Sequence, residues 1–544
     1  MHARLHRVPL FESNNIMIVP LTPLEFRQRA VILYGSKVGI VDGNKCFTYA
    51  EYDLRINRFA NALTSLGVDE GDVVSFIAYN SHQLLEAYYA VPQIQGVINP
   101  INIRLSSNEI EYILNHAEAK ILCFHQDFLP MVEEMRPRLP NVKDYIVIEA
   151  EKDVDWANNY ETLLENQSPD AEIDLDTVDE NAVIELFYTS GTIGTPKGVA
   201  ITNRSLYLHT LSAINGFQVT DEDALLHVVP LFHVNGWGTP QFLTAVGGKH
   251  VMLRKMDFGE ILRLIEEERI TKILGVPAIF NGLLAHPDLK KYDLSSLKEI
   301  IIGGAPSPLS LIVALEQEIG CKAIVGYGLT ETSPFGVIAR PKPHLKIDET
   351  TRLKTQVKTG LPIVGVRLRI IDENGLDVPR DEKTMGEIVF RSNIVMKEYL
   401  KDPKATSEVI VDGWFHSGDM AVVDDEGYIT IVDRKKDIII SGGENISSVE
   451  VEKIILNHPA VFETVVIGVP DEKWGEVAKA IVVLKPGTQA SEGEIINFVK
   501  ERLARYKAPK SVEFWNELPK GGTGKVLKRE IRKPYWEGHE KAVH

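Results

Sequence analysis

The chain has 544 residues, of which 44% are hydrophobic and 25% are charged, as is typical of a globular enzyme with several domains. Its 76 acidic and 59 basic residues give a net charge of −17. This balance argues against bulk nucleic-acid binding, which needs an extended basic surface. It does not exclude an anionic small ligand, because a local pocket can be basic inside an acidic protein.

Cysteine usage and apolar segments indicate the compartment. Cys46, Cys123 and Cys321 are scattered without CxxC spacing, so we expect neither a disulfide framework nor a zinc site. The N-terminal stretch lacks the apolar core of a secretory signal, and no apolar run reaches the ~18 residues of a membrane span. We therefore expect a cytoplasmic protein with no nucleic-acid partner and no integral-membrane part.

The first two thirds of the chain alternate between helical and strand patterns. Thr48 and Glu51 form a capping-box pattern before apolar residues at helical spacing, and short apolar runs read as buried strands. Such alternation predicts parallel sheets covered by helices. The expected elements are a helix from Thr48 to Gly67, a strand at 73–78, a helix at 82–97, strands at 183–188 and 199–201, a helix from Asn203, and a strand at 297–302.

The pattern changes near residue 433. Shorter β segments at 366–371 and 386–391 come before it. About a hundred residues with their own α+β pattern follow, including a boxed helix that begins at Ser491 and strands at 480–484 and 512–514. The charged run 433–437 marks the boundary, although a solvated linker face would have the same composition. We therefore expect an N-terminal domain of residues 1–435 and a C-terminal domain of residues 436–544.

The strongest local signal is the loop 188–198, Tyr-Thr-Ser-Gly-Thr-Ile-Gly-Thr-Pro-Lys-Gly, between two expected strands. Glycines let the backbone approach a ligand, hydroxyls donate hydrogen bonds and Lys197 supplies a positive charge, so the loop can hold a polyphosphate. It is not a P-loop, because Pro196 precedes the lysine, Gly198 follows it, and a strand rather than a helix comes next. A flexible surface turn is the alternative.

Three further loops carry candidate ligand groups. Tyr327 lies between two glycines and could present its ring to a purine, with Thr330 and Glu331 nearby for a phosphate and Mg²⁺. Asp419 follows Ser-Gly and could accept hydrogen bonds from a ribose, but a turn aspartate that binds its own backbone is the simpler interpretation. Lys525 lies in a glycine-rich loop of the C-terminal unit, where a solvated lysine is the common case.

Taken together and in this order, these loops resemble the adenylate-forming superfamily of acyl-CoA synthetases, 4-coumarate–CoA ligases, luciferases and peptide-synthetase adenylation domains. The resemblance extends from about residue 20 to about residue 530 and rests on the segments 188–198, 303–306, 326–331, 414–419, 433–445 and 519–525. The segments 231–237 and 433–437 are most similar to those of bacterial medium- and long-chain fatty acyl-CoA synthetases. The resemblance implies an α/β multidomain fold, with a large N-terminal domain of two α/β sheets plus a β-barrel and a small mobile α+β C-terminal domain.

The resemblance also implies site residues at the matching positions. Lys525 would bridge the substrate carboxylate and the α-phosphate, Thr330 would contact that phosphate, and Lys436 would be the hinge of the C-terminal domain. Glu331 and Thr192 would hold Mg²⁺. The implied contacts to ATP and CoA comprise Thr189, Ser190, Gly191, Thr192, Gly194, Thr195 and Lys197 at the phosphates, Gly303, Gly304, Ala305, Pro306, Gly326, Tyr327 and Gly328 around adenine, Asp419, Arg434 and Lys435 at the ribose, and Gly442, Gly443, Glu444 and Trp474 along the path of CoA.

Two residues would contact the acid itself. His233 would lie beside the carboxylate and Trp237 would line or gate a fatty-acid tunnel, although core packing would explain either residue as well. One departure from the family pattern is Ile193, where a second threonine is common, and we expect weaker ATP binding at most.

The expected function is thus an ATP-dependent, Mg²⁺-requiring ligation of a medium- or long-chain fatty acid to CoA through an acyl-adenylate. An aryl-acid or short-chain-acid CoA ligase of the same fold is the first alternative. An adenylation enzyme that loads a carrier protein and a non-catalytic binding protein are the others. Related bacterial enzymes often form dimers, so a homodimer is possible.

Overall fold

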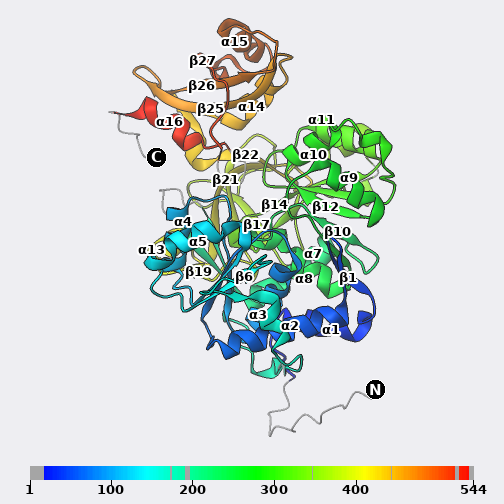
Figure 1. The fold of residues 1–544 in the computed structure, drawn as a ribbon. Coiled ribbons are helices and arrows are strands. Elements are labelled where there is room, and N and C mark those ends of the chain that lie inside the picture. Colours follow the sequence, from blue (N-terminus) through cyan, green and yellow to red (C-terminus); the bar gives the residue numbers. More distant parts are fainter. Residues whose placement is uncertain are drawn as a thin grey trace.

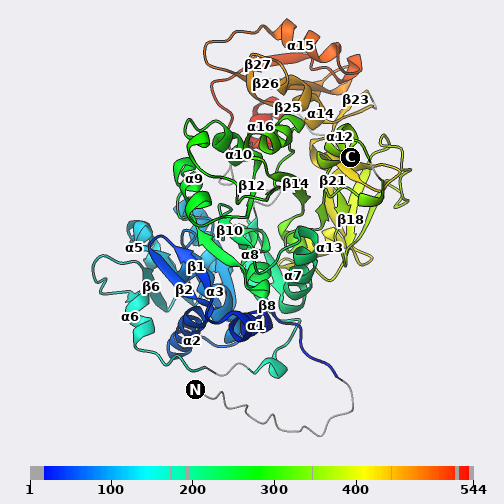
Figure 2. The ribbon, with the colours of Figure 1, turned by 90° about the vertical axis from the view of Figure 1, so that its right-hand side faces the viewer.

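The computed structural model describes residues 17–171, 174–189, 196–345, 347–442, 444–520 and 526–537. A large N-terminal part carries a smaller C-terminal unit at one end (Figure 1). The C-terminal unit stands apart from the first helices of the chain in the perpendicular view as well (Figure 2). No helix within these ranges is long and apolar enough to cross a membrane.

The first sheet has eight strands in the order β19-β9-β8-β4-β3-β5-β6-β7. Its central strands are parallel, whereas β9 and β19 join β8 in antiparallel register. The strands are β3 (Val73–Ile77), β4 (Val97–Pro100), β5 (Ile121–His125), β6 (Asp144–Ile148), β7 (Asn158–Asn159), β8 (Val183–Thr189), β9 (Lys197–Thr202) and β19 (Glu398–Tyr399), and the helices of this part are α2 (Tyr49–Ser65), α3 (His82–Gln93), α4 (Ser107–His116), α5 (Leu129–Met135) and α6 (Tyr160–Glu165).

The second sheet has nine strands in the order β16-β15-β14-β13-β12-β10-β11-β1-β2. It is parallel from β14 to β1, and β1 pairs with β11 across a long stretch of chain. The strands are β1 (Val38–Asp42), β2 (Lys45–Thr48), β10 (Ala224–His227), β11 (Lys249–Met252), β12 (Lys272–Gly275), β13 (Glu299–Ile302), β14 (Lys322–Tyr327), β15 (Val337–Ile338) and β16 (Leu361–Pro362), and the helices are α1 (Leu24–Tyr34), α7 (Asn203–Phe217), α8 (Val234–Val246), α9 (Phe258–Glu267), α10 (Pro277–Leu284), α11 (Leu309–Ala314) and α12 (Glu349–Gln356).

Two smaller sheets complete the molecule. In the third, β17, β18, β21 and β20 pair in that order and β22 pairs with β21, so this antiparallel sheet takes the place expected for the barrel. In the fourth, β24, β23, β26 and β25 pair in that order and β27 joins β26. Their elements are β17 (Arg367–Ile371), β18 (Gly386–Arg391), β20 (Ile410–Val411), β21 (Trp414–Val423), β22 (Ile429–Arg434) and α13 (Pro403–Val409), then β23 (Ile439–Ser441), β24 (Glu444–Ile446), β25 (Val461–Asp471), β26 (Gly475–Leu484), β27 (Ser511–Phe514), α14 (Ser448–Leu456), α15 (Glu492–Lys500) and α16 (Lys528–Trp536).

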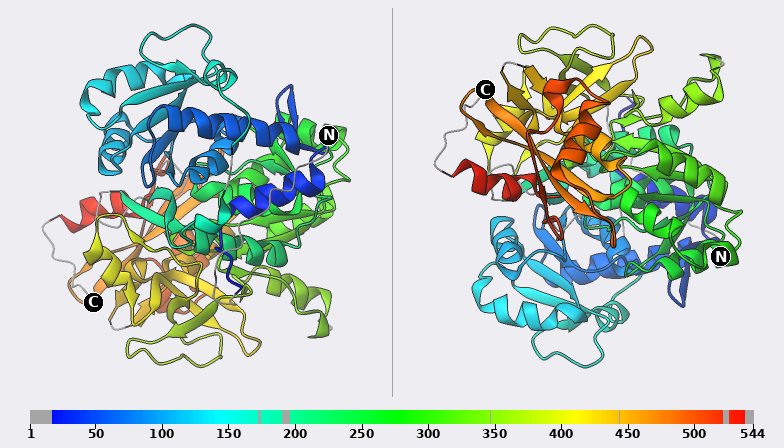
Figure 3. Two further views of the ribbon diagram at one scale, coloured as in Figure 1. Left: turned by 90° about the horizontal axis from the view of Figure 1, so that it is seen from below. Right: turned by 90° about the horizontal axis from the view of Figure 1, so that it is seen from above.

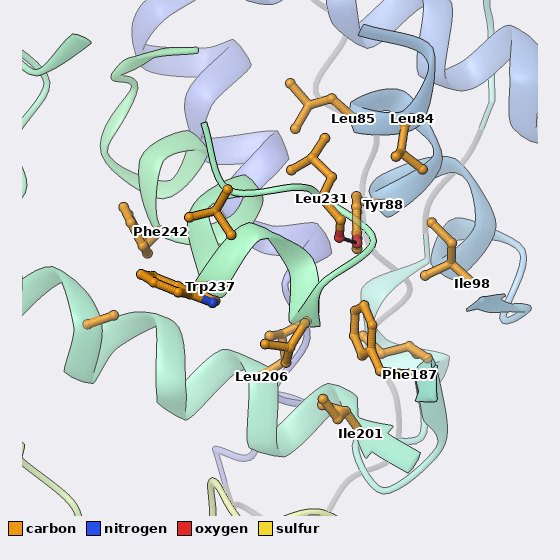
Figure 4. Packing of buried hydrophobic residues seen from close by; sticks show 14 of the residues in the cluster. Leu84, Leu85, Tyr88, Ile98, Phe187, Ile201, Leu206, Leu231, Trp237 and Phe242 are labelled. Carbon is orange, nitrogen blue, oxygen red and sulfur yellow. Dashed lines mark hydrogen bonds between the residues drawn. The ribbon is translucent and has the colours of Figure 1, made fainter. Parts of the chain in front are cut away.

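One hydrophobic cluster joins the two large sheets. It contains buried residues of α2, α3, α7 and α8 together with strand residues of both sheets, so these helices form the layer between them. Figure 4 shows Trp237 and Phe242 of α8 in this cluster, and the hydroxyl of Tyr88 donating to the carbonyl of Leu231 at 2.6 Å. Seen from below and from above, the two large sheets with their helices and the third, antiparallel sheet lie next to one another (Figure 3).

Most expected elements are confirmed within one or two residues. The side chain of Thr48 accepts from the N–H of Glu51 at the start of α2, and Ser491 and Glu494 cap α15 in the same way. Each such cap is worth about 1 kcal/mol. The helix expected over 82–97 was too long: α3 ends at Gln93 because Gln95 turns the chain with φ 59° and Val97 already belongs to β4. The parallel strands expected from the alternation form the centres of both large sheets, and β9 joins β8 at the edge in antiparallel register.

Candidate active site

Strand ends of the nine-stranded sheet gather the first group of candidate residues. Gly303 and Gly304 follow β13, and Tyr327 ends β14, so both segments lie at the carboxyl edge where open α/β sheets bind ligands. Gly304 has φ +75°, a conformation that favours glycine. A Cβ on Gly303 would lie 3.2 Å from both the Trp237 ring and the carbonyl oxygen of Gly326. The loop is thus packed closely against Trp237, with Ala305 and Pro306 exposed beyond it.

Tyr327, Asp419 and Arg434 form one hydrogen-bonded group. Asp419 and Arg434 face each other on β21 and β22, and Arg434 Nε lies 3.1 Å from Asp419 Oδ1. The Tyr327 hydroxyl donates to Asp419 Oδ2 at 2.6 Å. Burial, and after it the Asp419 charge, raises the pKa of Tyr327 well above its ordinary value, so the phenol remains a donor at neutral pH. A carboxylate has about four lone-pair sites, so Asp419 can accept further bonds from a bound diol.

A second group joins Glu331 to Lys197. The hydroxyl of Tyr399 donates to Glu331 Oε1 at 2.7 Å, and Lys197 Nζ lies 4.8 Å from the centre of the Tyr399 ring. Strand β19 positions this tyrosine by pairing Tyr399 with Val199 of β9. The backbone N–H of Met396 also donates to the carbonyl of Glu331 at 2.8 Å. Sequence reasoning missed Tyr399, because no motif of the chain pointed to the residues around 398.

His233 and Trp237 stand at the start of α8 in an unusual backbone. Residues 234–238 have φ between +36° and +85°, and three of them are not glycine. Such left-handed residues cost about 1–2 kcal/mol each, so the surroundings must hold them in place. Trp237 is 5% exposed and packs against the Gly303-Gly304 loop. The centre of its ring lies 5.8 Å from the centre of the Phe335 ring, in an edge-on arrangement. His233 is half-buried at the N-cap of the helix.

A buried carboxyl group holds this left-handed turn. Asn235 accepts from the Gly238 N–H at 2.6 Å and donates from Nδ2 to Glu185 Oε2 at 2.8 Å. Gln241 donates to Glu185 Oε1, also at 2.8 Å. Burial raises the pKa of Glu185 to about 8 despite these two donors. The sequence did contain a signal, since Glu185 lies in the middle of an otherwise apolar expected strand.

The C-terminal candidates contact one another in their own unit. The N–H of Gly442 donates to the carbonyl of Trp474 at 2.8 Å, and a Cβ on Gly442 would lie 2.6 Å from the Trp474 ring. Trp474 is 42% exposed and Glu444 is also exposed. Lys435 pairs with Glu387 of β18 at 3.1 Å. The structure therefore gathers the nucleotide candidates of the N-terminal part, while Gly442, Glu444 and Trp474 form a separate group.

Several candidates lie outside the described residues. For the phosphate loop the structure describes its two ends, where Thr189 of β8 faces Lys197 of β9 in register. Thr330 and Glu331 begin a short 3-10 turn, Thr330–Thr332, directly after Leu329. The candidates outside the described residues are Ser190, Gly191, Thr192, Gly194, Thr195, Gly443 and Lys525, together with Ile193.

The fold and the site together define a nucleotide-binding enzyme of the adenylate-forming class, with two large α/β sheets and a small C-terminal unit. Residues 27–400 match the family described as AMP-binding enzyme, and residues 450–525 match the AMP-binding enzyme C-terminal domain. The chain belongs to this AMP-binding enzyme family. The resemblance stated from the sequence is thereby confirmed.

Individual relatives cover nearly the whole chain. The long-chain-fatty-acid–CoA ligase of Thermus thermophilus is 39% identical over 94% of this chain and 95% of its own length. The medium-chain-fatty-acid–CoA ligase of Ectopseudomonas oleovorans is 37% identical over 90% of both chains. Among solved structures, the anthranilate CoA ligase AuaEII in complex with anthranoyl-AMP is similar with a TM-score of 0.85, at 26% identity over 95% of this chain and 98% of that one.

Proposed function

We propose that the protein ligates a medium- or long-chain fatty acid to CoA, with Mg²⁺ as the metal. The activity itself is that of an ATP-dependent acid–thiol ligase that forms AMP, as in the named relatives. The observation that carries the nucleotide-dependent chemistry is a pair of side-chain groups near the end of β14. One group is Tyr327 with Asp419 and Arg434. The other is Glu331 with Tyr399 and Lys197. The first suits a nucleoside and the second suits a polyphosphate.

In the first step the substrate carboxylate attacks the α-phosphorus of ATP and pyrophosphate leaves. Negative charge develops on the transferring phosphoryl group, and fixed cations stabilise it. Lys525 and Lys197 would supply positive charge there, while Thr330 would donate a hydrogen bond. Tyr327 would stack on adenine, and Asp419 would accept from the ribose hydroxyls beside Arg434 and Lys435.

The residues present fit a magnesium ion held mainly by phosphates. Within the described ranges, no group of three or more His, Cys, Asp or Glu side chains could hold a metal by itself. Mg²⁺ in nucleotide sites is commonly bound by one or two carboxylates together with substrate phosphates. Glu331 would supply the carboxylate and Thr192 a hydroxyl, and the bound ion would offset phosphate charge.

In the second step the thiol of CoA attacks the acyl-adenylate carbonyl and AMP leaves. We infer that this step uses the C-terminal domain of residues 436–544, rotated about Lys436 against residues 1–435. Gly442, Gly443 and Glu444 would then line the approach of the thiol, and Trp474 would pack against the CoA nucleotide. The exposure of Trp474 in the C-terminal unit supports this, since a buried ring could not receive a ligand.

The nature of the acid rests on the apolar wall at Trp237. This ring packs against Gly303 and Gly304 inside the main hydrophobic cluster, which favours an aliphatic chain beside a carboxylate-binding His233. An aromatic acid is the second candidate, because the similar AuaEII is an anthranilate CoA ligase. A carrier protein in place of CoA is a third acceptor to test.

We also propose a cytoplasmic homodimer. The three unpaired cysteines at positions 46, 123 and 321 support a reducing compartment. Light scattering coupled to size exclusion would test the dimer, and a mass of one chain of 60.8 kDa at micromolar concentration would contradict it.

The decisive experiment measures pyrophosphate release from MgATP over a panel of acids from acetate to palmitate, with benzoate and coumarate, in the presence and absence of CoA. Turnover that requires CoA and rises with aliphatic chain length supports the proposal. Release that ignores CoA, or that is confined to aromatic acids, overturns it in favour of the alternatives. A Lys525→Ala variant should lose acyl-adenylate formation yet still form thioester from supplied acyl-AMP, and equal loss of both steps would contradict the role of this lysine.

A further inference from the structure

Two buried histidines lie next to each other on the second sheet and take no part in either proposed step. His227 ends β10, and His250 lies on the neighbouring strand β11, where it pairs with Leu225. Because side chains alternate between the two faces of a strand, both imidazoles lie on the face of Leu225 and Met252, which belong to the hydrophobic cluster of α7 and α8. The two histidines are 2% and 0% exposed, so their ring nitrogens need partners inside the protein.

These partners come from α8. His227 Nε2 lies 3.0 Å from His250 Nδ1, and the two rings are nearly parallel at 11°. Thr239 Oγ1 lies 3.2 Å from His227 Nδ1, and Thr244 Oγ1 lies 3.0 Å from His250 Nε2. Both threonines are buried residues of α8. The four side chains form a continuous hydrogen-bonded series, the histidine chain, in which every ring nitrogen has a partner.

The histidine chain has a direction. Burial lowers the pKa of His227 to about 3 and that of His250 well below its ordinary value, so both rings are neutral. A neutral imidazole has one donor nitrogen and one acceptor nitrogen. The hydroxyl of Thr239 donates to the carbonyl oxygen of Gly236 at 3.4 Å. His227 then donates from Nδ1 to Thr239, and His250 donates from Nδ1 to His227. The hydroxyl of Thr244 completes the series by donating to His250, so the histidine chain ends on the carbonyl of Gly236.

Gly236 lies in the left-handed turn, directly before Trp237, with φ +55°. A Cβ on Gly236 would lie 3.1 Å from Thr239 Oγ1, so the threonine hydroxyl is packed closely against the turn. Glu185 of β8 holds the preceding residue, Asn235, from the first sheet. The turn is therefore tied to both large sheets, through the two residues that precede Trp237.

We propose that His227 and His250 are positioning residues for the acid site, and that they set its preference for acyl-chain length. They fix the carbonyl of Gly236, and through this carbonyl the place of the Trp237 ring. This inference rests on the proposed function, in which Trp237 lines the acid site, and it adds residues that determine the specificity of that site. Apolar side chains of similar size could fill the same space, but only a satisfied polar network selects one arrangement of the turn.

The size of the expected effect follows from the last hydrogen bond of the histidine chain. Such a bond, when it is lost from one arrangement only, changes an equilibrium by about five-fold. Thr239→Val removes the hydroxyl and keeps the shape of the side chain, whereas Thr239→Ser keeps the hydroxyl. These two variants therefore separate the hydrogen bond from the packing at one position.

The test compares kcat/KM for acids from hexanoate to palmitate, with MgATP and CoA. Thr239→Val should reduce the ratio between the best and the poorest acid by about five-fold, because the Trp237 ring is then held less firmly, while the KM for ATP stays constant. Thr239→Ser should keep the ratio. Thr210→Val is the matched control, since it also removes a buried hydroxyl, one that donates to Leu206 within α7. An unchanged ratio in Thr239→Val, or an equal change in Thr210→Val, overturns the proposal.

Replacement of both histidines distinguishes positioning from packing. The double variant His227→Leu, His250→Leu fills the space and leaves no imidazole unpaired. It should reduce the ratio in the same direction as Thr239→Val, and the addition of Thr239→Val should then change little more. A ratio equal to that of the wild type would overturn the role of the histidines. The two Thr239 variants keep the test decisive should the double variant fail to fold.

A readout independent of catalysis is hydrogen exchange of the backbone amides at 234–238 in the protein without substrates. These amides should exchange about five-fold faster in Thr239→Val than in Thr239→Ser or Thr210→Val. Equal rates overturn the histidine chain as the support of the turn, whatever acid the enzyme uses. Absence of ligase activity in the wild-type protein, or turnover confined to aromatic acids, would instead contradict the proposed function, so the two failures are distinguishable.

Discussion

Glu185 offers the sharpest test of how the left-handed turn at 234–238 is held together. Its carboxyl group is fully buried and receives one amide N–H from Asn235 and one from Gln241. Replacement by alanine leaves both donors buried without an acceptor, at about 1–3 kcal/mol each. We therefore expect Glu185→Ala to lower the free energy of unfolding by about 2–6 kcal/mol, and to release the turn at 234–238.

The isosteric change Glu185→Gln tests the protonation state of the same group. Burial raises the pKa of Glu185 in the folded protein to about 8, against an ordinary value near 4.5. The folded state therefore binds the proton more tightly than the unfolded state. The stability associated with this proton is fully present below about pH 4.5 and is lost as the pH rises towards 8, by about 1.4 kcal/mol per pH unit. A glutamine has no such dependence.

Thermal unfolding of the wild type and Glu185→Gln, measured in parallel from pH 5 to pH 9, separates this group from all others. The wild-type melting temperature should fall relative to that of the variant between pH 5 and 8, and the gap should then stay constant. The first transition is the one to compare, because a chain of several domains need not unfold in two states. Parallel curves between pH 5 and 8 would refute the argument that burial keeps Glu185 protonated.

Three further predictions concern the nucleotide and acid groups. Tyr399→Phe removes the hydrogen bond to Glu331 but keeps the aromatic ring beside Lys197. The Mg²⁺ concentration for half-maximal pyrophosphate release should therefore rise about five-fold, while the KM for the acid stays constant. An unchanged magnesium titration would contradict this. Asp419→Asn deprives Arg434 of its ionic partner and should raise the KM for ATP about tenfold or more, whereas an unaltered ATP titration would count against a ribose contact. Gly303→Ala places a methyl group 3.2 Å from the Trp237 ring and should lower kcat/KM for palmitate relative to hexanoate about tenfold; loss that is equal for both acids would show that this wall does not sense chain length.

Local chemistry explains which parts of the fold the sequence could predict. The capping box at Thr48 and the glycine loops at 303–306 and 326–328 depend on neighbours within a few residues, and the structure has them at the expected places. The end of α3 was misjudged because Ile94 and Val97 continue the apolar spacing of the helix, although Gln95 and Gly96 interrupt it before β4.

Contacts between distant segments could not be predicted in this way. Tyr399 reaches Glu331 across 68 positions, and it is placed by a two-residue strand that the sequence does not signal. The left-handed turn at 234–238 has no local cause at Val234 or Trp237, whose side chains disfavour it. In the sequence, only Glu185 indicated the network that stabilises this turn, because a carboxyl group in an apolar strand needs buried hydrogen-bond partners.

The pairing of β1 with β11 has a consequence for folding during synthesis. Strand β1 lies near the start of the chain, yet its parallel partner begins at Lys249, roughly 200 residues later. At a synthesis rate of about 5–20 residues per second, β11 is synthesised on the order of 10–40 s after β1. During that interval β2 is the only neighbouring strand of the sheet that is available to Ile40 and Val41. Slowed translation before residue 249 would therefore prolong a vulnerable nascent state, in which chaperone binding near the N-terminus should be strongest.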